Sequence, residues 1–267
     1  MTRLDRILEP EVMDTVAEAV DYNSLDHSAV NRVFVDDFLA ALSVPAGGKG
    51  GRGSRRAATS IGSPMFDLGS AGASPSQTSL PQTAPLQIFD AGTGTALIPL
   101  ELLSRGVHAT IAASDLAEQM LVVARENVRA AGFDQSIRLV LSDCKRLPDA
   151  SATYDAVMSN SIVHHIPQPR FVLAELWRIL KPGGLLFVRD LMRPADQTNL
   201  DAIVQTYAGS ANAHQQQMFR DSLHAALTID EISELLREIG IPTVGVSATS
   251  DRHWTIVAHK SPDSNRL

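Results

Sequence analysis

Cysteine, basic charge and long apolar runs are all scarce in this chain of 267 residues. The single cysteine, Cys144, excludes an intrachain disulfide framework and any metal site built from several cysteines. No apolar run approaches the roughly 18 residues of a membrane-spanning helix. The N-terminus carries acidic residues early and has no apolar core of signal-peptide length. We therefore expect a protein of a reducing, cytoplasmic compartment with no membrane span.

Basic residues are outnumbered, and the formal net charge is −7. A general nucleic-acid binder normally carries a basic surface, so no nucleic-acid partner is expected. A hydrophobic content of 44% is enough for a full core, and 20% charged residues is ordinary for a soluble protein. The length allows one large domain or two small ones, and the sequence leaves the oligomeric state open.

Residues 1–44 carry a helical pattern of apolar residues. One interpretation is a helix packed on the main domain. The other is a lid over a bound cofactor, with Tyr22, Asp26 or His27 near the active site, because terminal helices often close such sites. Asp26 or Ser28 can cap the helix start. The apolar face is predicted to hold Val30, Phe34, Phe38 and Ala41 or Leu42.

Residues 45–85 differ sharply in composition, since Gly, Pro and Ser make up 20 of these 41 residues. Such a segment cannot bury enough apolar surface to offset its ordering entropy, so we expect a disordered linker. Residues 47–56 hold four cations, which could contact RNA or an anionic surface. A solvated linker is favoured, because this stretch has no aromatic side chain to stack on a base.

From residue 86 onward, predicted strands and helices alternate, which is typical of an α/β fold with a doubly wound, mostly parallel sheet. The last two strands are joined too briefly for a helical crossover and should form an antiparallel pair. We expect a seven-stranded sheet in a domain over 86–260, followed by a tail at 261–267. The predicted strands are 86–89, 107–113, 137–141, 156–159, 185–189, 243–248 and 254–259. The main predicted helices are 95–104, about 116–131, 169–180 and 229–239.

The stretch at 87–101 contains a buried strand, a carboxylate at its end (Asp90) and a turn with Gly92 and Gly94. Glycine reaches positive φ cheaply and lets a ligand approach the backbone. The free N–H groups at the start of the next helix add donors and positive partial charge. This pattern suits a nucleotide-like ligand at the carboxyl end of the strand. A dinucleotide fingerprint would have a third glycine where Leu97 stands, which disfavours a nicotinamide cofactor.

The Asp90-x-Gly92-x-Gly94 spacing resembles motif I of the class I S-adenosylmethionine-dependent methyltransferases. Further stretches at 112–115, 141–144 and 178–184 extend the resemblance over residues 86–260. The His-His-Ile-Pro and Arg-x-Leu-Lys-Pro-Gly-Gly patterns look closest to the small-molecule branch, which includes ubiquinone/menaquinone-type C-methyltransferases and many O- and N-methyltransferases. The resemblance implies a Rossmann-like methyltransferase fold, S-adenosyl-L-methionine as cofactor and a small-molecule methyl acceptor.

Two departures from the family pattern are visible. Thr95 stands where a glycine is frequent, which leaves the cofactor assignment intact. No Asn-Pro-Pro-Tyr-like motif follows the strand at 156–159, which weakens a nucleobase or glutamine amide as the methyl target. The sequence leaves carbon, oxygen and nitrogen open as acceptor atoms, and a general base is needed only if the acceptor must lose a proton.

Asp115 lies 25 residues after Asp90, at the end of the second predicted strand. A carboxylate there can accept hydrogen bonds from both ribose hydroxyls of a cofactor. Alternatively, Asp115 and Glu118 form a capping box at the helix start. Leu116 and Met120 line an adenine pocket in the first case, although core packing also explains them.

The resemblance implies further cofactor contacts. Asp143 accepts from the adenine amino group, and the backbone N–H of Cys144 donates to the ring. Asn160 and the adjoining Ser161 bind the amino group of the cofactor. Asp90 orients the methionine part or caps the turn, in which Gly92, Thr93 and Gly94 face the cofactor.

Four residues are candidates for catalysis: His164, His165, Asp190 and Arg193. The histidine pair can supply a general base or play a structural part. No metal site is expected, because adjacent histidines point in different directions on most backbones and no third ligand is evident. Asp190 and Arg193 can orient a polar substrate or form a surface ion pair. An NAD-dependent oxidoreductase and a non-catalytic cofactor-binding protein are the alternative functions.

Overall fold

The computed structural model describes residues 3–10, 12, 14–24, 26–44, 84–242 and 245–262. The expected linker at 45–85 lies outside the described residues except for its last two positions. The expected tail at 261–267 lies outside them from residue 263 onward. The disorder of the linker and the boundary of the tail therefore stay predictions.

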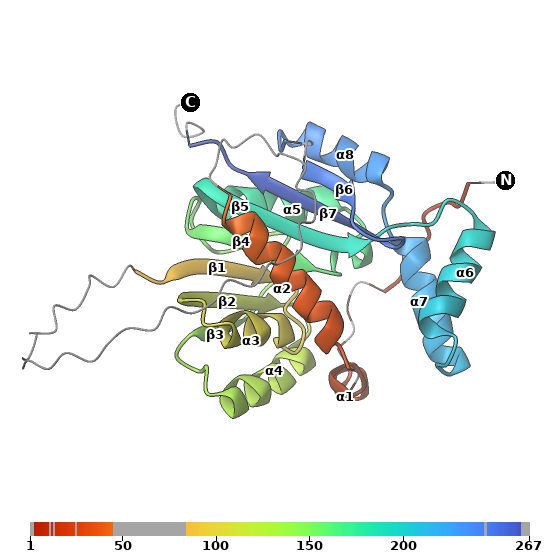
Figure 1. Cartoon of the computed structure of the whole chain (residues 1–267), viewed down its shortest axis with the longest axis horizontal. Coiled ribbons are helices and arrows are strands. Elements are labelled where there is room, and N and C mark those ends of the chain that lie inside the picture. Colours follow the sequence, from red (N-terminus) through yellow and green to blue (C-terminus); the bar gives the residue numbers. More distant parts are fainter. Residues whose placement is uncertain are drawn as a thin grey trace, which may run out of the picture.

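The described chain forms a seven-stranded sheet in the order β3-β2-β1-β4-β5-β7-β6 (Figure 1). The first five strands are parallel, and β7 runs antiparallel to both β5 and β6. This confirms the predicted fold class. The strands are β1 (Leu86–Ala91), β2 (Ala109–Asp115), β3 (Ile137–Leu141), β4 (Tyr154–Asn160), β5 (Leu180–Leu191), β6 (Val246–Ala248) and β7 (His253–His259).

Helices cover both faces of the sheet. Successive strand residues point to opposite faces, so two neighbouring residues of β1 show which helices cover each face. Ile88 packs in a core with Phe34 and Phe38 of α2, whereas Phe89 packs in a second core with Leu173 of α5. The first face carries α2 (Ser28–Leu42), α3 (Leu97–Ser104) and α4 (Glu118–Ala131), and the second carries α5 (Pro169–Ile179) and α8 (Ile229–Glu238).

A third group of elements lies beyond the carboxyl ends of the parallel strands (Figure 1). It contains α1 (Val16–Ser24), α6 (Gln197–Ala208) and α7 (Ala213–Ala225). Leu191 at the end of β5 packs with Leu200 of α6 and Leu223 of α7. The segment at 3–10 joins this group, since the Ile7 N–H donates to the His224 carbonyl at 3.2 Å. Ligands bind at this edge of a parallel sheet.

Three local expectations were wrong in detail. The helix expected from residue 95 begins at Leu97, because Ala96 is left-handed with φ +64°. The Lys-Pro-Gly-Gly turn at 181–184 does not precede its strand but lies within β5, where the pairing register shifts. Val30 was expected on the buried face of α2, yet it is exposed.

Candidate functional site

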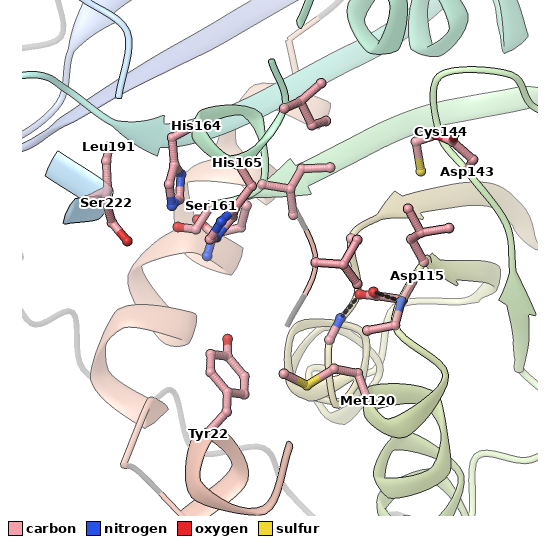
Figure 2. A pocket seen from close by; sticks show the side chains of 18 of the residues that line it. Tyr22, Asp115, Met120, Asp143, Cys144, Ser161, His164, His165, Leu191 and Ser222 are labelled. Atoms are coloured by element: carbon pink, nitrogen blue, oxygen red, sulfur yellow. Dashed lines mark hydrogen bonds between the residues drawn. The ribbon is translucent and has the colours of Figure 1, made fainter. Parts of the chain in front are cut away.

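A cavity of about 400 Å³ opens at the carboxyl edge of the parallel strands (Figure 2). This volume is within the usual range for small-molecule sites. Most of the predicted site residues line it, but Asp90, Thr93, Asp190 and Arg193 do not. The predicted residues that line it are Gly92, Gly94, Asp115, Leu116, Met120, Asp143, Cys144, Asn160, Ser161, His164 and His165.

The glycine turn after β1 forms one wall of the cavity. Gly92 and Gly94 have φ angles of +69° and +54°, which residues with a side chain rarely adopt. A Cβ added at Gly92 would overlap the Cγ2 methyl of Ile162 and lie 3.0 Å from its Cβ. A Cβ at Gly94 would lie 3.6 Å from the ring of Tyr22. The two glycines therefore keep a cradle open that any side chain would fill.

Asp115 connects this turn to the start of α4. Its Oδ2 accepts from the Gly94 N–H at 2.7 Å, and its Oδ1 accepts from the Ala117 N–H at 2.9 Å (Figure 2). The alternative capping box does not form, because Ala117 is the N-cap of α4. A carboxylate has about four acceptor sites, so Asp115 keeps acceptor capacity for a ligand. Burial raises its pKa, although the backbone donors oppose this shift.

The loop after β4 begins with a residue in an unusual backbone conformation. Ser161 has φ +58°, a left-handed conformation that costs a residue with a side chain about 1–2 kcal/mol. Its N–H donates to the Arg189 carbonyl at 2.9 Å, which holds this conformation. The bend places Asn160, Ser161 and Ile162 on the cavity wall.

His164 is held in place from behind by Asp190. The ring Nδ1 lies 2.5 Å from Asp190 Oδ1, and Asp190 Oδ2 accepts from the Val163 N–H at 2.6 Å. Asp190 is fully buried, and burial alone would raise its pKa. His164, together with the N–H groups of Val163 and Leu191, outweighs burial and holds that pKa below its usual value. Asp190 thus acts on the cavity through His164.

Glu9 is the main site residue that we did not predict. Its Oε1 lies 3.1 Å from His165 Nδ1 and 3.5 Å from His164 Nε2. The two imidazole rings are 4.1 Å apart and tilted by 35°, so both face the same carboxylate. The premise that the histidines diverge and have no third ligand near them was therefore wrong. No local pattern around residue 9 signals this role.

Arg6 fixes the segment that carries Glu9. Its guanidinium donates to the carbonyl oxygens of Ala225 at 2.6 Å, Ile166 at 3.0 Å and His164 at 3.2 Å. These acceptors lie in the loop that carries the two histidines and at the end of α7, which carries Ser222, and both segments line the cavity. Further along the chain Val12 and Tyr22 line the cavity, whereas Glu9 lies against the two histidines of its wall.

Comparisons with known proteins agree with this geometry. A family described as "Methyltransferase domain" matches residues 89–188. The demethylmenaquinone methyltransferase of Deinococcus radiodurans is 30% identical over 171 residues, which cover 60% of this chain and 69% of that protein. The chain belongs to the S-adenosylmethionine-dependent methyltransferases. It is an enzyme of this family, and S-adenosyl-L-methionine is its cofactor.

Two further relatives of the methyltransferase extend the comparison. The ubiquinone biosynthesis O-methyltransferase of Xylella fastidiosa is 27% identical, with 63% of this chain and 65% of that protein covered. A solved structure from Methanococcus maripaludis, assigned as an S-adenosyl-L-methionine-dependent methyltransferase, is 13% identical with a TM-score of 0.61. The match covers 96% of this chain and 97% of that chain, and the two proteins share the same fold.

The described residues fit the cofactor of the methyltransferase. The glycine cradle leaves room for a ligand against the backbone, and Asp115 retains acceptor capacity beside it. At the neighbouring strand end, Asp143 Oδ1 accepts from the Lys145 N–H at 2.9 Å, which leaves other acceptor sites of this carboxylate at the cavity. Carboxylate acceptors of this kind suit the hydroxyl and amino groups of a nucleoside, which are donors.

Asp90 and Thr93 lie behind the glycine turn of the methyltransferase, not on the cavity wall. Within the described structure, Asp90 Oδ2 has no hydrogen-bond partner. Burial, aided by the charge of Asp115, raises the pKa of Asp90 to about 7. A carboxyl group with this pKa is poised to change its protonation when a positive charge arrives nearby.

Cys144 lines the cavity of the methyltransferase with a buried thiol. Burial raises the pKa of this thiol to about 12, which disfavours the reactive thiolate at neutral pH. The contact of its backbone N–H with the cofactor stays a prediction.

Arg193 of the methyltransferase is buried away from the cavity. It forms an ion pair with Glu231 and donates to the Ala226 carbonyl at 2.8 Å. It also lines a separate hollow between the end of β5, α6 and the start of α8. Its observed contacts tie β5 to α8.

The N-terminal helices of the methyltransferase reach the cavity through one side chain. Tyr22 of α1 lines it, and the His27 ring stacks on Tyr22 at 4.4 Å. Asp26 and His27 are not among the lining residues. Whether α1 moves as a lid stays a prediction.

Proposed function

We propose that the enzyme transfers the methyl group of S-adenosyl-L-methionine to a small organic acceptor that carries a ring. The observation that carries this proposal is Asp115, a carboxylate with spare acceptor sites at one end of a cavity that reaches His164 at its other end (Figure 2). Apolar side chains near the histidines, including Leu191 and Phe219, provide walls for a ring. The quinone-related names of the two relatives support this class of acceptor.

The cofactor supplies a methyl group already activated on a sulfonium, so the protein must mainly position the reactants and exclude water. We assign Asp115 to the ribose hydroxyls and Asp143, with the Cys144 N–H, to the adenine edge. The remaining contacts follow the cavity wall. Leu116 and Met120 pack on the adenine, while Gly92, Gly94, Asn160 and Ser161 bind the amino-acid part, and Asp90 and Thr93 support the turn.

The acceptor lies against the opposite end of the cavity. Asp190 fixes the His164 ring through Nδ1, which leaves Nε2 directed toward Glu9 and the cavity. A proton on the acceptor therefore meets basic groups of the chain at this end. Tyr22 and Ile162 close the cavity between the two ends and limit the access of water. We assign no acceptor contact to Arg193, because it is buried elsewhere.

Calorimetric titration of wild type and Asp115→Asn tests this proposal. We expect wild type to bind S-adenosyl-L-methionine and not NAD. The amide loses one charged acceptor, so affinity should fall by about 10- to 100-fold. Asp134→Asn makes the same chemical change on an exposed residue and should bind like wild type. Binding of NAD, with none of S-adenosyl-L-methionine, would favour the oxidoreductase alternative instead.

Binding should also release a proton from Asp90. The free protein holds this carboxyl about half protonated at pH 7, since its pKa is raised to about 7. The positive charges of the cofactor favour the ionised form, so about half a proton should leave per cofactor bound at that pH. Titrations at pH 7 in buffers of different ionisation enthalpy measure this number. It should shrink toward zero at pH 9 and in Asp90→Asn; an equal release from Asp90→Asn would assign the proton elsewhere.

No helix among the described residues is long and apolar enough to cross a membrane. The cytoplasmic location and the absence of a nucleic-acid partner stay predictions from composition. Fractionation of the source cells and a gel-shift assay test them directly.

A further inference from the structure

Three potential metal ligands converge at the acceptor end of the cavity. They are Glu9, His164 and His165, and one donor atom of each lies within 4.8 Å of the other two. Glu9 Oε1 is 3.1 Å from His165 Nδ1 and 3.5 Å from His164 Nε2. Ligands about 2.1 Å from a tetrahedral zinc ion are about 3.4 Å apart, so two of the three edges are already close to the required length.

Each of the two best-buried ligands is oriented by a partner on its far side. Asp190 occupies His164 Nδ1 and leaves Nε2 for the cluster. The Ser222 hydroxyl donates to Glu9 Oε2 at 3.1 Å and leaves Oε1 for the cluster. A carboxylate behind a ligating histidine is the usual outer support of a metal site, because it fixes both the tautomer and the ring.

Two buried atoms of the cluster make no well-aligned hydrogen bond. Glu9 Oε1 and His165 Nδ1 lie 3.1 Å apart, as an ion pair when His165 is protonated, but the geometry of this contact is not that of a hydrogen bond. Buried polar atoms without a well-formed hydrogen bond are costly. A cation with nitrogen and oxygen ligands satisfies both atoms at once.

We propose that Glu9 Oε1, His164 Nε2 and His165 Nδ1 bind one divalent transition-metal ion. Two imidazoles and one carboxylate form the ligand set of open catalytic zinc sites, which keep a position for water or substrate. Imidazole ligands favour ions of the zinc, iron or nickel type over Mg²⁺ and Ca²⁺, which prefer oxygen. The carboxylates of Glu9 and Asp190 balance the charge of the ion.

His164 and His165 line the cavity, so we place the open position of this ion toward it, and its use rests on the proposed function. A hydroxyl group on the ring of the acceptor would coordinate there. The O–H bond breaks, its proton passes to water, and the oxygen keeps the electron pair while bound to the metal ion. A metal ion lowers the pKa of a bound hydroxyl in this way. The acceptor class is therefore a phenol or enol, with oxygen as the atom that receives the methyl group.

Metal titration of the full-length, tag-free protein tests the site after chelator treatment and dialysis. We expect calorimetry with ZnSO₄ to give one ion per chain, and MgCl₂ to give no binding. The variants Glu9→Gln and His165→Gln should each weaken zinc binding at least about 100-fold, because each removes a direct ligand. His108→Gln removes an exposed histidine far from the cluster and should bind zinc like wild type.

Two parallel readouts keep the result interpretable. Co²⁺ added to wild type should give the visible absorption of a low-coordinate site with nitrogen ligands, which does not depend on any variant folding. Titration of S-adenosyl-L-methionine into the same samples shows whether each variant is folded and whether the proposed function holds. Cofactor binding without zinc binding, or zinc binding unchanged in both variants, overturns the metal site and leaves an ion-paired base cluster. Zinc binding without cofactor binding overturns the proposed function alone.

Discussion

Gly92→Ala should lower the affinity for S-adenosyl-L-methionine at least about 100-fold. Alanine at φ +69° is strained by about 1–2 kcal/mol. Its methyl group also overlaps Ile162, and overpacking of this kind costs a further 1–3 kcal/mol or so. The loop that begins at Ile162 leads directly into His164, so relief of the clash moves both walls of the cavity. Calorimetric titration of the cofactor measures the loss.

Gly132→Ala is the matched control. Gly132 ends α4 with φ +76°, and nothing lies within 4 Å of an added Cβ. The backbone strain is therefore similar, but the clash is absent. We expect a loss of stability of about 1–2 kcal/mol without a change in cofactor affinity. Equal cofactor affinities of the two variants would show that the contact between Gly92 and Ile162 does not shape the site.

Asp190→Ala should lower the free energy of unfolding by about 3–5 kcal/mol. Asp190 is fully buried and accepts from the His164 ring and from the N–H groups of Val163 and Leu191. Removal of the carboxylate leaves these buried groups without an acceptor, which is far costlier than the loss of an exposed pair. Urea unfolding followed by circular dichroism measures the change.

Asp201→Ala provides the comparison for an exposed acid. Asp201 pairs with Arg220 at the surface, and such pairs contribute about 0–1 kcal/mol. Asp190→Asn keeps the shape and one acceptor oxygen, so its loss should fall between the two alanine variants. A similar stability of Asp190→Ala and Asp201→Ala would contradict the structural role of Asp190 behind His164.

The mostly parallel sheet, its antiparallel last pair and the ligand edge could be predicted because the signals are local. Each of Asp90, Asp115 and Asp143 follows an apolar run, and parallel strands place their carboxyl ends at one edge. The capping box of α8, formed by Thr228 and Glu231, is another local signal, because it depends on two residues three positions apart. The sequence could not decide between a ribose contact and a capping box for Asp115, because both roles use the same carboxylate.

Glu9 and Ile162 could not be predicted, for a different reason. Glu9 meets His165 across more than 150 residues of sequence, and the contacts that bring it there, such as those of Arg6 with distant carbonyls, are themselves long-range. Ile162 matters because Ser161 turns the backbone into a left-handed conformation, which serine rarely adopts. For Arg193 the sequence left a substrate contact and an ion pair open, and the structure shows a buried ion pair with Glu231.

The hold of Arg6 on the Ala225 carbonyl joins residues that are 219 positions apart. A ribosome adds about 5–20 residues each second, so roughly 10–40 s separate the synthesis of the two partners. During that interval the N-terminal segment lacks its contact on α7, while β1 to β5 are made. The cavity is therefore completed only once α7 has been made, with α8, β6 and β7 still to follow.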